Sequence, residues 1–175
     1  MNITSLKFFV SFAIVLLFRL VRGLFTLPGL EPVMTTTIPF AKEGGKVAGF
    51  LFAAFSIAIF DVVTGTAGWG TVVNATTYGI VGVAAASWFQ RHEFSRTNTV
   101  GFAIVGTLFY DLITGVIATP LLYPISFGQA AVGQIPFTLW HLAGNVAFVT
   151  LVSPLIHRCI LANPRFSWGR EVAHA

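Results

Sequence analysis

Charge is what this sequence lacks most. Of its 175 residues, only 9% are Asp, Glu, Lys or Arg, whereas 55% are hydrophobic. A soluble domain carries about 25% charged residues, so this composition excludes the soluble class. The apolar stretches are also longer than the alternating segments of about ten residues that form membrane barrels. Because a chain in lipid must satisfy its own backbone hydrogen bonds, we predict an all-α integral membrane protein with a single domain.

Cysteine is scarce, and motifs typical of enzymes are absent. The single cysteine, Cys159, excludes an internal disulfide and a cysteine-based metal site. The four histidines do not show the spacing of metal ligands. There is no phosphate-binding loop ending in Gly-Lys-Ser/Thr, and neither HExxH nor GxSxG occurs. We therefore expect no enzyme, no metal and no cofactor, and a chain that cannot use ATP by itself.

Apolar runs separated by polar or proline-rich segments predict six transmembrane helices. Arg19 and Arg22 stand where a signal peptide would have small residues for cleavage, so we expect the first helix to be retained. Pro28, Pro32 and Pro39 make the second helix short and interrupted, after a loop at residues 25–30. The predicted helices cover residues 6–24, 31–43, 44–63, 69–89, 98–118 and 133–159, and a polar tail covers 161–175.

The ten basic residues predict how this bundle is oriented. Positive residues concentrate on the cytoplasmic side of a membrane. With six helices, eight of the ten lie on the side of the two termini, and only Arg19 and Arg22 lie on the other. We therefore predict cytoplasmic termini, and we interpret the net charge of +4 as an orientation signal rather than a nucleic-acid surface. A five-helix alternative, in which residues 24–41 do not span, fits the charges slightly better but leaves an apolar segment unused.

One short pattern occurs twice, as FDVVTG at residues 60–65 and YDLITG at 110–115. Each copy ends a long apolar run, where a glycine is typical of the residue after a helix C-terminus. Asp61 and Asp111 would then lie near the negative end of a helix dipole, where a carboxylate is disfavoured. In the six-helix arrangement both lie on the outer side with Arg19 and Arg22. They form either interfacial ion pairs or part of a functional site.

Polar residues follow one face of two predicted helices. In the helix at 133–159 their offsets are 0, 4, 7 and 11, and in the helix at 69–89 they are 0, 3 and 7, so each set shares a helical face. Both faces lie in the outer half, which predicts a cup that opens outward rather than a continuous pore. Hydrogen bonds between helices are the alternative use for such residues. The two sets are Gln134, Thr138, His141 and Asn145, and Thr71, Asn74 and Tyr78.

Small residues recur at every fourth position from just before the third predicted helix into its middle. They are Ala41, Gly45, Gly49 and Ala53. A small-xxx-small strip allows two helices to approach closely. We expect it to serve packing within the bundle, against the small residues of the helix at 69–89, and a docking face for another membrane subunit is the alternative.

The chain resembles a substrate-binding S component of the energy-coupling factor (ECF) vitamin transporters. The similarity covers most of the chain. It rests on six short helices, the loop LPGLEP at 27–32, glycines opening the third helix at 44–49, Asp61 ending it, and QIPFTLWHLAGN at 134–145. The resemblance implies capture of a vitamin or related micronutrient from outside a prokaryotic cytoplasmic membrane. It also implies a transmembrane coupling subunit and two cytoplasmic ATPases as partners, although residues 5–13 lack the Ala-x-x-x-Ala spacing often used for docking.

The expected binding site combines charged, polar and aromatic residues. The arginines would suit a carboxylate or phosphate on the ligand, the aspartates would orient the arginines or bind an amine, and the aromatic rings would stack. Two other classes stay open: a self-sufficient small carrier or channel, and a membrane enzyme or assembly factor. The candidate residues are Arg19, Arg22, Asp61, Trp69, Asn74, Tyr78, Tyr110, Asp111, Gln134, Trp140, His141 and Asn145.

Overall fold

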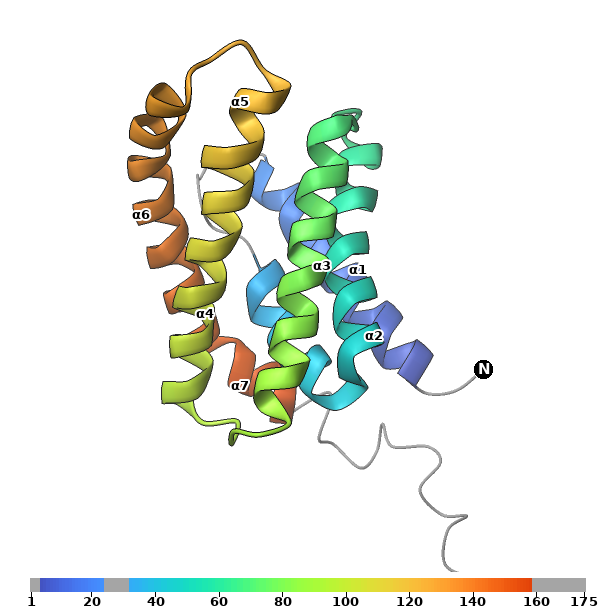
Figure 1. The fold of residues 1–175 in the computed structure, drawn as a ribbon. Coiled ribbons are helices and arrows are strands. Elements are labelled where there is room, and N and C mark those ends of the chain that lie inside the picture. The colour runs from blue at the N-terminus through green and yellow to red at the C-terminus, as the bar shows by residue number, and fades with distance from the viewer. Residues whose placement is uncertain (1–3, 24–31, 159–175) are drawn as a thin grey trace, which may run out of the picture.

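The computed structural model describes residues 4–23 and 32–158, with the backbone alone at residues 4–8, 11, 22 and 23. This part of the chain is almost wholly helical and has no strand (Figure 1), which confirms the all-α prediction for it. The loop predicted at 25–30 and the tail at 161–175 lie outside it. The elements are α1 Thr4–Gly23, α2 Val33–Val63, α3 Trp69–Phe89, α4 Arg96–Asp111, η1 Leu112–Ala118, α5 Thr119–Leu122, α6 Phe127–Leu151 and α7 Ser153–Ile156.

Four helical segments are long and apolar enough to cross a membrane. They are Val33–Val63, Trp69–Phe89, Arg96–Leu122 and Phe127–Ile156. Many large apolar side chains on them face outward, among them Val105 and Leu139. An exposed apolar surface of this extent is typical of a protein that contacts lipid. The composition and the structure thus agree on a helical bundle compatible with a membrane, and the six-helix arrangement stays a prediction.

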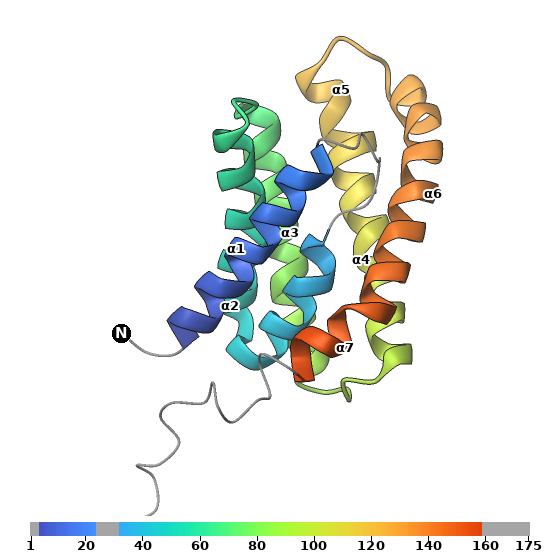
Figure 2. The ribbon, with the colours of Figure 1, turned by 180° about the vertical axis from the view of Figure 1, so that it is seen from behind.

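The element α2 consists of two helices joined at a break. At Gly45 the backbone has φ 78° and ψ −171°, a conformation that glycine adopts without steric cost. Figures 1 and 2 show the chain running downward before this residue and upward after it. The two halves correspond to the helices predicted at 31–43 and 44–63. Residues 33–44 span about 18 Å at 1.5 Å per residue, so this half alone is shorter than a hydrocarbon core of about 30 Å.

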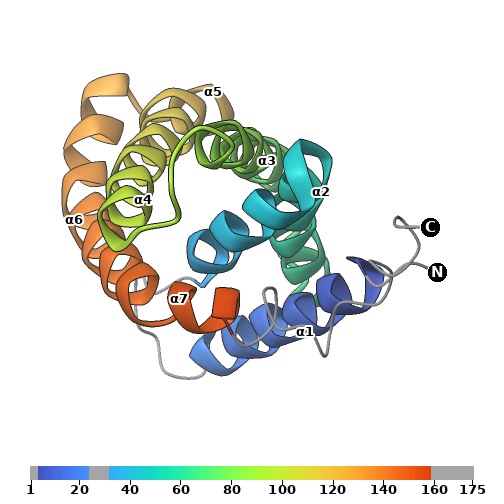
Figure 3. The same cartoon turned by 90° about the horizontal axis from the view of Figure 1, so that it is seen from below.

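The first half of α2 lies at the centre of the bundle. Seen from below, it stands inside a ring formed by the other helices (Figure 3). All residues from 32 to 41 are buried, which is typical of a helix that is apolar or weakly polar on every side. Met34 and Ile38 belong to one apolar core with Tyr78 of α3, Tyr110 of α4 and Val149 of α6. This short helix therefore holds the surrounding helices together.

The second half of α2 packs closely against α3. A methyl group added to Gly49 would lie 2.7 Å from the carbonyl oxygen of Gly82, so the two backbones are in direct contact. Ala41 and Ala53 are fully buried. The predicted strip is not a single helical face, however, because Gly45 lies at the break. The buried residues of the strip, Ala41, Gly49 and Ala53, therefore pack against other residues inside the bundle.

The two copies of the repeated pattern have different structures. The first copy ends α2, and Gly65 has φ 72° directly after the C-cap residue Thr64, in agreement with the predicted cap. The second copy lies within a continuous helical segment that extends to Leu122. The prediction that both aspartates lie near helix ends is therefore wrong for Asp111, which lies in the middle of its segment.

The helix continues past Gly115 by widening into the π-helical turn η1. Pro120 has no N–H group, and its ring would crowd the carbonyl four residues earlier in a regular α-helix. The hydroxyl of Thr119 donates to the carbonyl of Thr114, five residues back, at 2.8 Å. The wider turn thus accommodates the proline, and the Thr119 hydroxyl bonds across it.

The last long helix begins earlier than predicted. Ser126 accepts a hydrogen bond from the backbone N–H of Gln129, and the Gln129 side chain accepts one from the backbone N–H of Ser126. This reciprocal arrangement is a capping box, so α6 begins at Phe127 rather than at residue 133. Pro136 consequently lies inside the helix instead of in its first turn.

Candidate functional site

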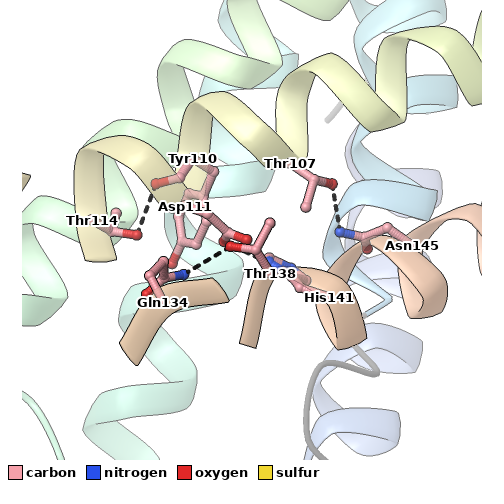
Figure 4. A network of polar contacts seen from close by, with 8 residues as sticks. All are labelled: Thr107, Tyr110, Asp111, Thr114, Gln134, Thr138, His141 and Asn145. Carbon is pink, nitrogen blue, oxygen red and sulfur yellow. Dashed lines mark hydrogen bonds and ion pairs between the residues drawn. The ribbon is translucent and has the colours of Figure 1, made fainter. Parts of the chain in front are cut away.

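Two interhelical hydrogen bonds connect α4 and α6 in the interior of the bundle. Nδ1 of His141 lies 2.7 Å from Oδ1 of Asp111, and Nδ2 of Asn145 donates to Oγ1 of Thr107 at 2.8 Å (Figure 4). The partners on each helix are four residues apart, so they lie on one face and the two bonds are one helical turn apart. All four residues are buried. We call these four residues the polar ladder.

Three atoms of the polar ladder have no hydrogen-bond partner among the residues that the structure describes. They are Oδ2 of Asp111, Nε2 of His141 and Oδ1 of Asn145. A buried polar atom without a partner costs about 1–3 kcal/mol, and more where it carries charge. Three such atoms within two helical turns make the polar ladder the candidate functional site.

Aromatic rings from three helices surround the Asp111–His141 pair. The ring of Tyr110 meets His141 edge-on at 5.9 Å between centroids, and Phe137 lies 5.4 Å from the same imidazole. Tyr78 of α3, fully buried, lies 4.2 Å from Tyr110. These rings supply contact area beside a small number of polar groups, which is the usual composition of a ligand site.

Gln134 continues the polar face of α6 above the polar ladder. Its amide donates to Oγ1 of Thr138 at 3.3 Å (Figure 4). The Gln134 side chain also packs against Gly115 of η1 so closely that a Cβ atom there would collide with it. A groove of about 350 Å³ runs between α4, η1 and α6, and Asp111, Gln134 and Thr138 are the polar residues among its apolar walls.

A second pocket lies near the upper end of the bundle. Its volume is about 360 Å³, and it is lined by Asp61, Trp69, Asn74 and Tyr123 among others. The hydroxyl of Thr71 donates to Oδ2 of Asp61 at 2.7 Å. This pocket shares no lining residue with the groove beside Asp111. Three of the predicted site residues are thus grouped here, away from the polar ladder.

The remaining candidates lie elsewhere. Arg19 is buried, donates to the carbonyl of Ser56 at 2.6 Å and stacks 4.0 Å above the ring of Phe60, so these contacts connect α1 to α2. The side chain of Arg22 lies outside the described residues. Trp140 is 63% exposed, on the outer surface of α6. Of the twelve predicted residues, the structure gathers Tyr78, Tyr110, Asp111, His141 and Asn145 around the polar ladder, with Gln134 two helical turns before His141 on α6.

The prediction missed Thr107 and the threonines of the central helix. Thr107 lies four residues before Asp111, a spacing that places both on one face of α4. Thr35 and Thr37 are fully buried, and their hydroxyls have no partner among the described residues. A run of three threonines in an apolar segment was the signal available for the central helix.

Neither metal ligands nor relatives identify the site. In residues 4–23 and 32–158 no group of three or more His, Cys, Asp or Glu side chains is arranged to hold a metal ion. Comparisons with protein-family models, curated proteins and solved structures found no match to this chain. Functional inference therefore depends on the geometry itself.

Proposed function

We propose that this protein is the membrane-embedded substrate-binding subunit of an ECF-type importer. In this role it captures a vitamin or related micronutrient from outside a prokaryotic cell and delivers it through a coupling subunit driven by two cytoplasmic ATPases. The observation that carries the proposal is the polar ladder between α4 and α6. Three of its buried polar atoms have no hydrogen-bond partner among the described residues, and ionisable groups at membrane depth are costly and are therefore candidates for function.

The distribution of charge supports the orientation that this role requires. The turn at Gly45, the loop between α3 and α4, and the end of α7 all lie at the lower end of Figure 1. We assign this end to the cytoplasm because Lys42, Lys46, Arg91, Arg96 and Arg158 lie there in sequence. The upper pocket around Asp61 then faces outward. The six helical segments of the proposal are α1, the two halves of α2, α3, α4 to α5, and α6 to α7.

The interior below the polar ladder favours a binding subunit over a channel. Phe40 stacks on Phe52 at 4.5 Å, and Phe89 lies 5.8 Å from Phe102. Phe40, Phe52 and Phe89 are all buried. A water-filled path would need polar groups at this depth, so release toward the cytoplasm would require a movement that a partner drives. This is the role of the ATP-dependent coupling module.

Binding to the purified protein tests the proposal. In detergent, a panel of vitamins and related micronutrients should contain a compound that raises the melting temperature of the wild-type protein. Asp111→Ala and His141→Ala should abolish that shift, whereas Ser87→Ala should keep it, because the Ser87 hydroxyl bonds the carbonyl of Val83 within its own helix. An unchanged shift in both ladder variants would exclude the proposed site.

A further inference from the structure

We propose that the polar ladder selects a positively charged ligand that donates N–H hydrogen bonds, such as an amidinium, a guanidinium or a protonated amine. This inference rests on the proposed binding function and specifies the chemical class of its substrate. It differs from the sequence-based expectation that Arg19 or Arg22 receives a carboxylate or phosphate, and among the described contacts Arg19 bonds Ser56 and stacks on Phe60.

The hydrogen-bond capacities of the ladder residues determine this class. A carboxylate only accepts hydrogen bonds, so His141 Nδ1 must donate to Asp111 Oδ1. When this imidazole is neutral, its Nε2 carries a lone pair and accepts. Because Nδ2 of Asn145 donates to Thr107, the remaining Oδ1 of Asn145 also accepts. The three open atoms of the ladder are therefore all acceptors, and they require donors.

The charge of the ladder determines the sign of the ligand. Within the described residues, His141 is the one ion-pair partner of Asp111, and a neutral imidazole leaves the pair with a net negative charge. The side chains of His141 and Asp111 are only 2% and 3% exposed. A buried charge without a counter-charge is strongly disfavoured, so a cation that binds here supplies a counter-charge that the described residues do not provide.

The spacing of the ladder residues and the neighbouring rings favour a flat cation. Residues four apart on a helix have Cβ atoms about 5–6 Å from each other, which is the width of a small planar group that bridges both levels of the ladder. Tyr110 and Tyr78 lie beside it with their rings 4.2 Å apart. Aromatic rings attract cations through their negatively charged faces. An amidinium on a ring satisfies the acceptors, the charge and the aromatic walls together.

Three probes of nearly equal shape separate the possible ligand classes. Benzamidine is a cation with N–H donors, benzamide is neutral with a donor and an acceptor, and benzoate is an anion with acceptors only. Their dissociation constants for the purified wild-type protein in detergent can be measured by calorimetry. We expect benzamidine to bind most tightly. Preferred binding of benzamide, which a protonated His141 would produce, or of benzoate would overturn the inference.

Two variants test whether the preference for benzamidine depends on the polar ladder. Asp111→Asn keeps the shape of the side chain but removes its charge, and it should weaken benzamidine binding roughly thirtyfold or more, the range for loss of one partner of a buried charge pair. Ser87→Ala should bind benzamidine as the wild type does. Equal affinity of wild type and Asp111→Asn, or no binding of benzamidine to the wild type, would overturn the inference.

The micronutrient panel and the benzamidine assay together distinguish a wrong cation preference from a wrong binding function. If a compound from the micronutrient panel binds through Asp111 and His141 but is an anion, the binding function stands and the cation preference is wrong. If no compound of the panel shifts the melting temperature and benzamidine does not bind, both are wrong.

Discussion

A carboxylate inside an apolar bundle is stable only when its oxygens are paired. Asp111 gives one oxygen to His141 and keeps the other buried and open among the described residues. In water this would be a minor defect, but hydrocarbon offers no substitute partner. The same residue lines the groove between α4 and α6. At the scale of single residues, the pair with His141 is therefore where the structure departs most from a purely structural core.

The hydrogen bond between Thr107 and Asn145, the second of the ladder, should give a measurable coupling energy. Thr107→Ala and Asn145→Ala should each destabilise the protein, and the double variant should lose less than the sum, by about 0.5–2 kcal/mol. The free energy of unfolding in mixed detergent measures the cycle. Thr150→Ala is the control, since Thr150 bonds the carbonyl of Val146 in its own helix. Full additivity would mean that the bond at 2.8 Å contributes nothing.

Arg19 has a structural role that predicts a loss of stability. It is 4% exposed and donates a charge-assisted hydrogen bond to the Ser56 carbonyl. Such bonds contribute about 1.5–3 kcal/mol, so Arg19→Ala should lower the free energy of unfolding by about that amount. Arg19→Lys should recover only part of it, because a lysine cannot both bond the carbonyl and stack on Phe60 as a planar group. A stable Arg19→Ala variant that has lost ligand binding would instead support the substrate role predicted from the sequence.

At the scale of elements, the contact between α2 and α3 depends on two glycines. A Cβ at position 82 would collide with the backbone of Gly49. Backbone cannot move aside as a side chain can, so the helices would have to separate.

Gly82→Ala should therefore destabilise the protein by about 1–3 kcal/mol, the usual cost of overpacking. Gly101→Ala on α4 is the matched control, because it has open space around it and an alanine is favoured in a helix by roughly 0.5–1 kcal/mol. Thermal unfolding of the two variants in the same detergent gives the comparison. Equal melting temperatures would contradict the close contact.

Element boundaries were predictable where local chemistry decides them. The helix predicted at residues 69–89 has the bounds of α3, and the cap at Gly65 follows from the first copy of the repeated pattern. The second copy differs because Pro120 and Thr119, beyond the pattern, widen the helix into η1 instead of ending it. The early start of α6 depends on the capping box at Ser126, whose signal lies in a segment assigned to a loop.

The grouping of site residues was predictable only within one helix. Helical spacing placed His141 and Asn145 on a common face, and the structure has them both in the ladder. Periodicity does not reveal which faces of different helices meet. Asp61 and Asp111 therefore appeared equivalent in sequence, yet they lie in separate sites, since the helical segment stops just after Asp61 but continues to Leu122 after Asp111.

At the scale of the whole molecule, the other helices form a ring around the first half of α2 (Figure 3). The proposed orientation can be tested with single cysteines after Cys159→Ser removes the native thiol. Ala67→Cys in the upper loop should react with a membrane-impermeant maleimide on intact cells, whereas Glu93→Cys in the lower loop should react only after permeabilisation. Both positions are exposed. The reverse pattern would invert the orientation and place the basic loops outside.

The central claim is that the polar ladder holds a small molecule. Native mass spectrometry of the protein purified gently from its membranes tests this most directly, because it detects a bound compound by mass, whatever that compound is. Wild-type protein should carry a small-molecule adduct that is absent from the Asp111→Asn, His141→Gln double variant and present in Ser87→Ala. The same spectrum for wild type and double variant, with or without an adduct, would contradict the claim.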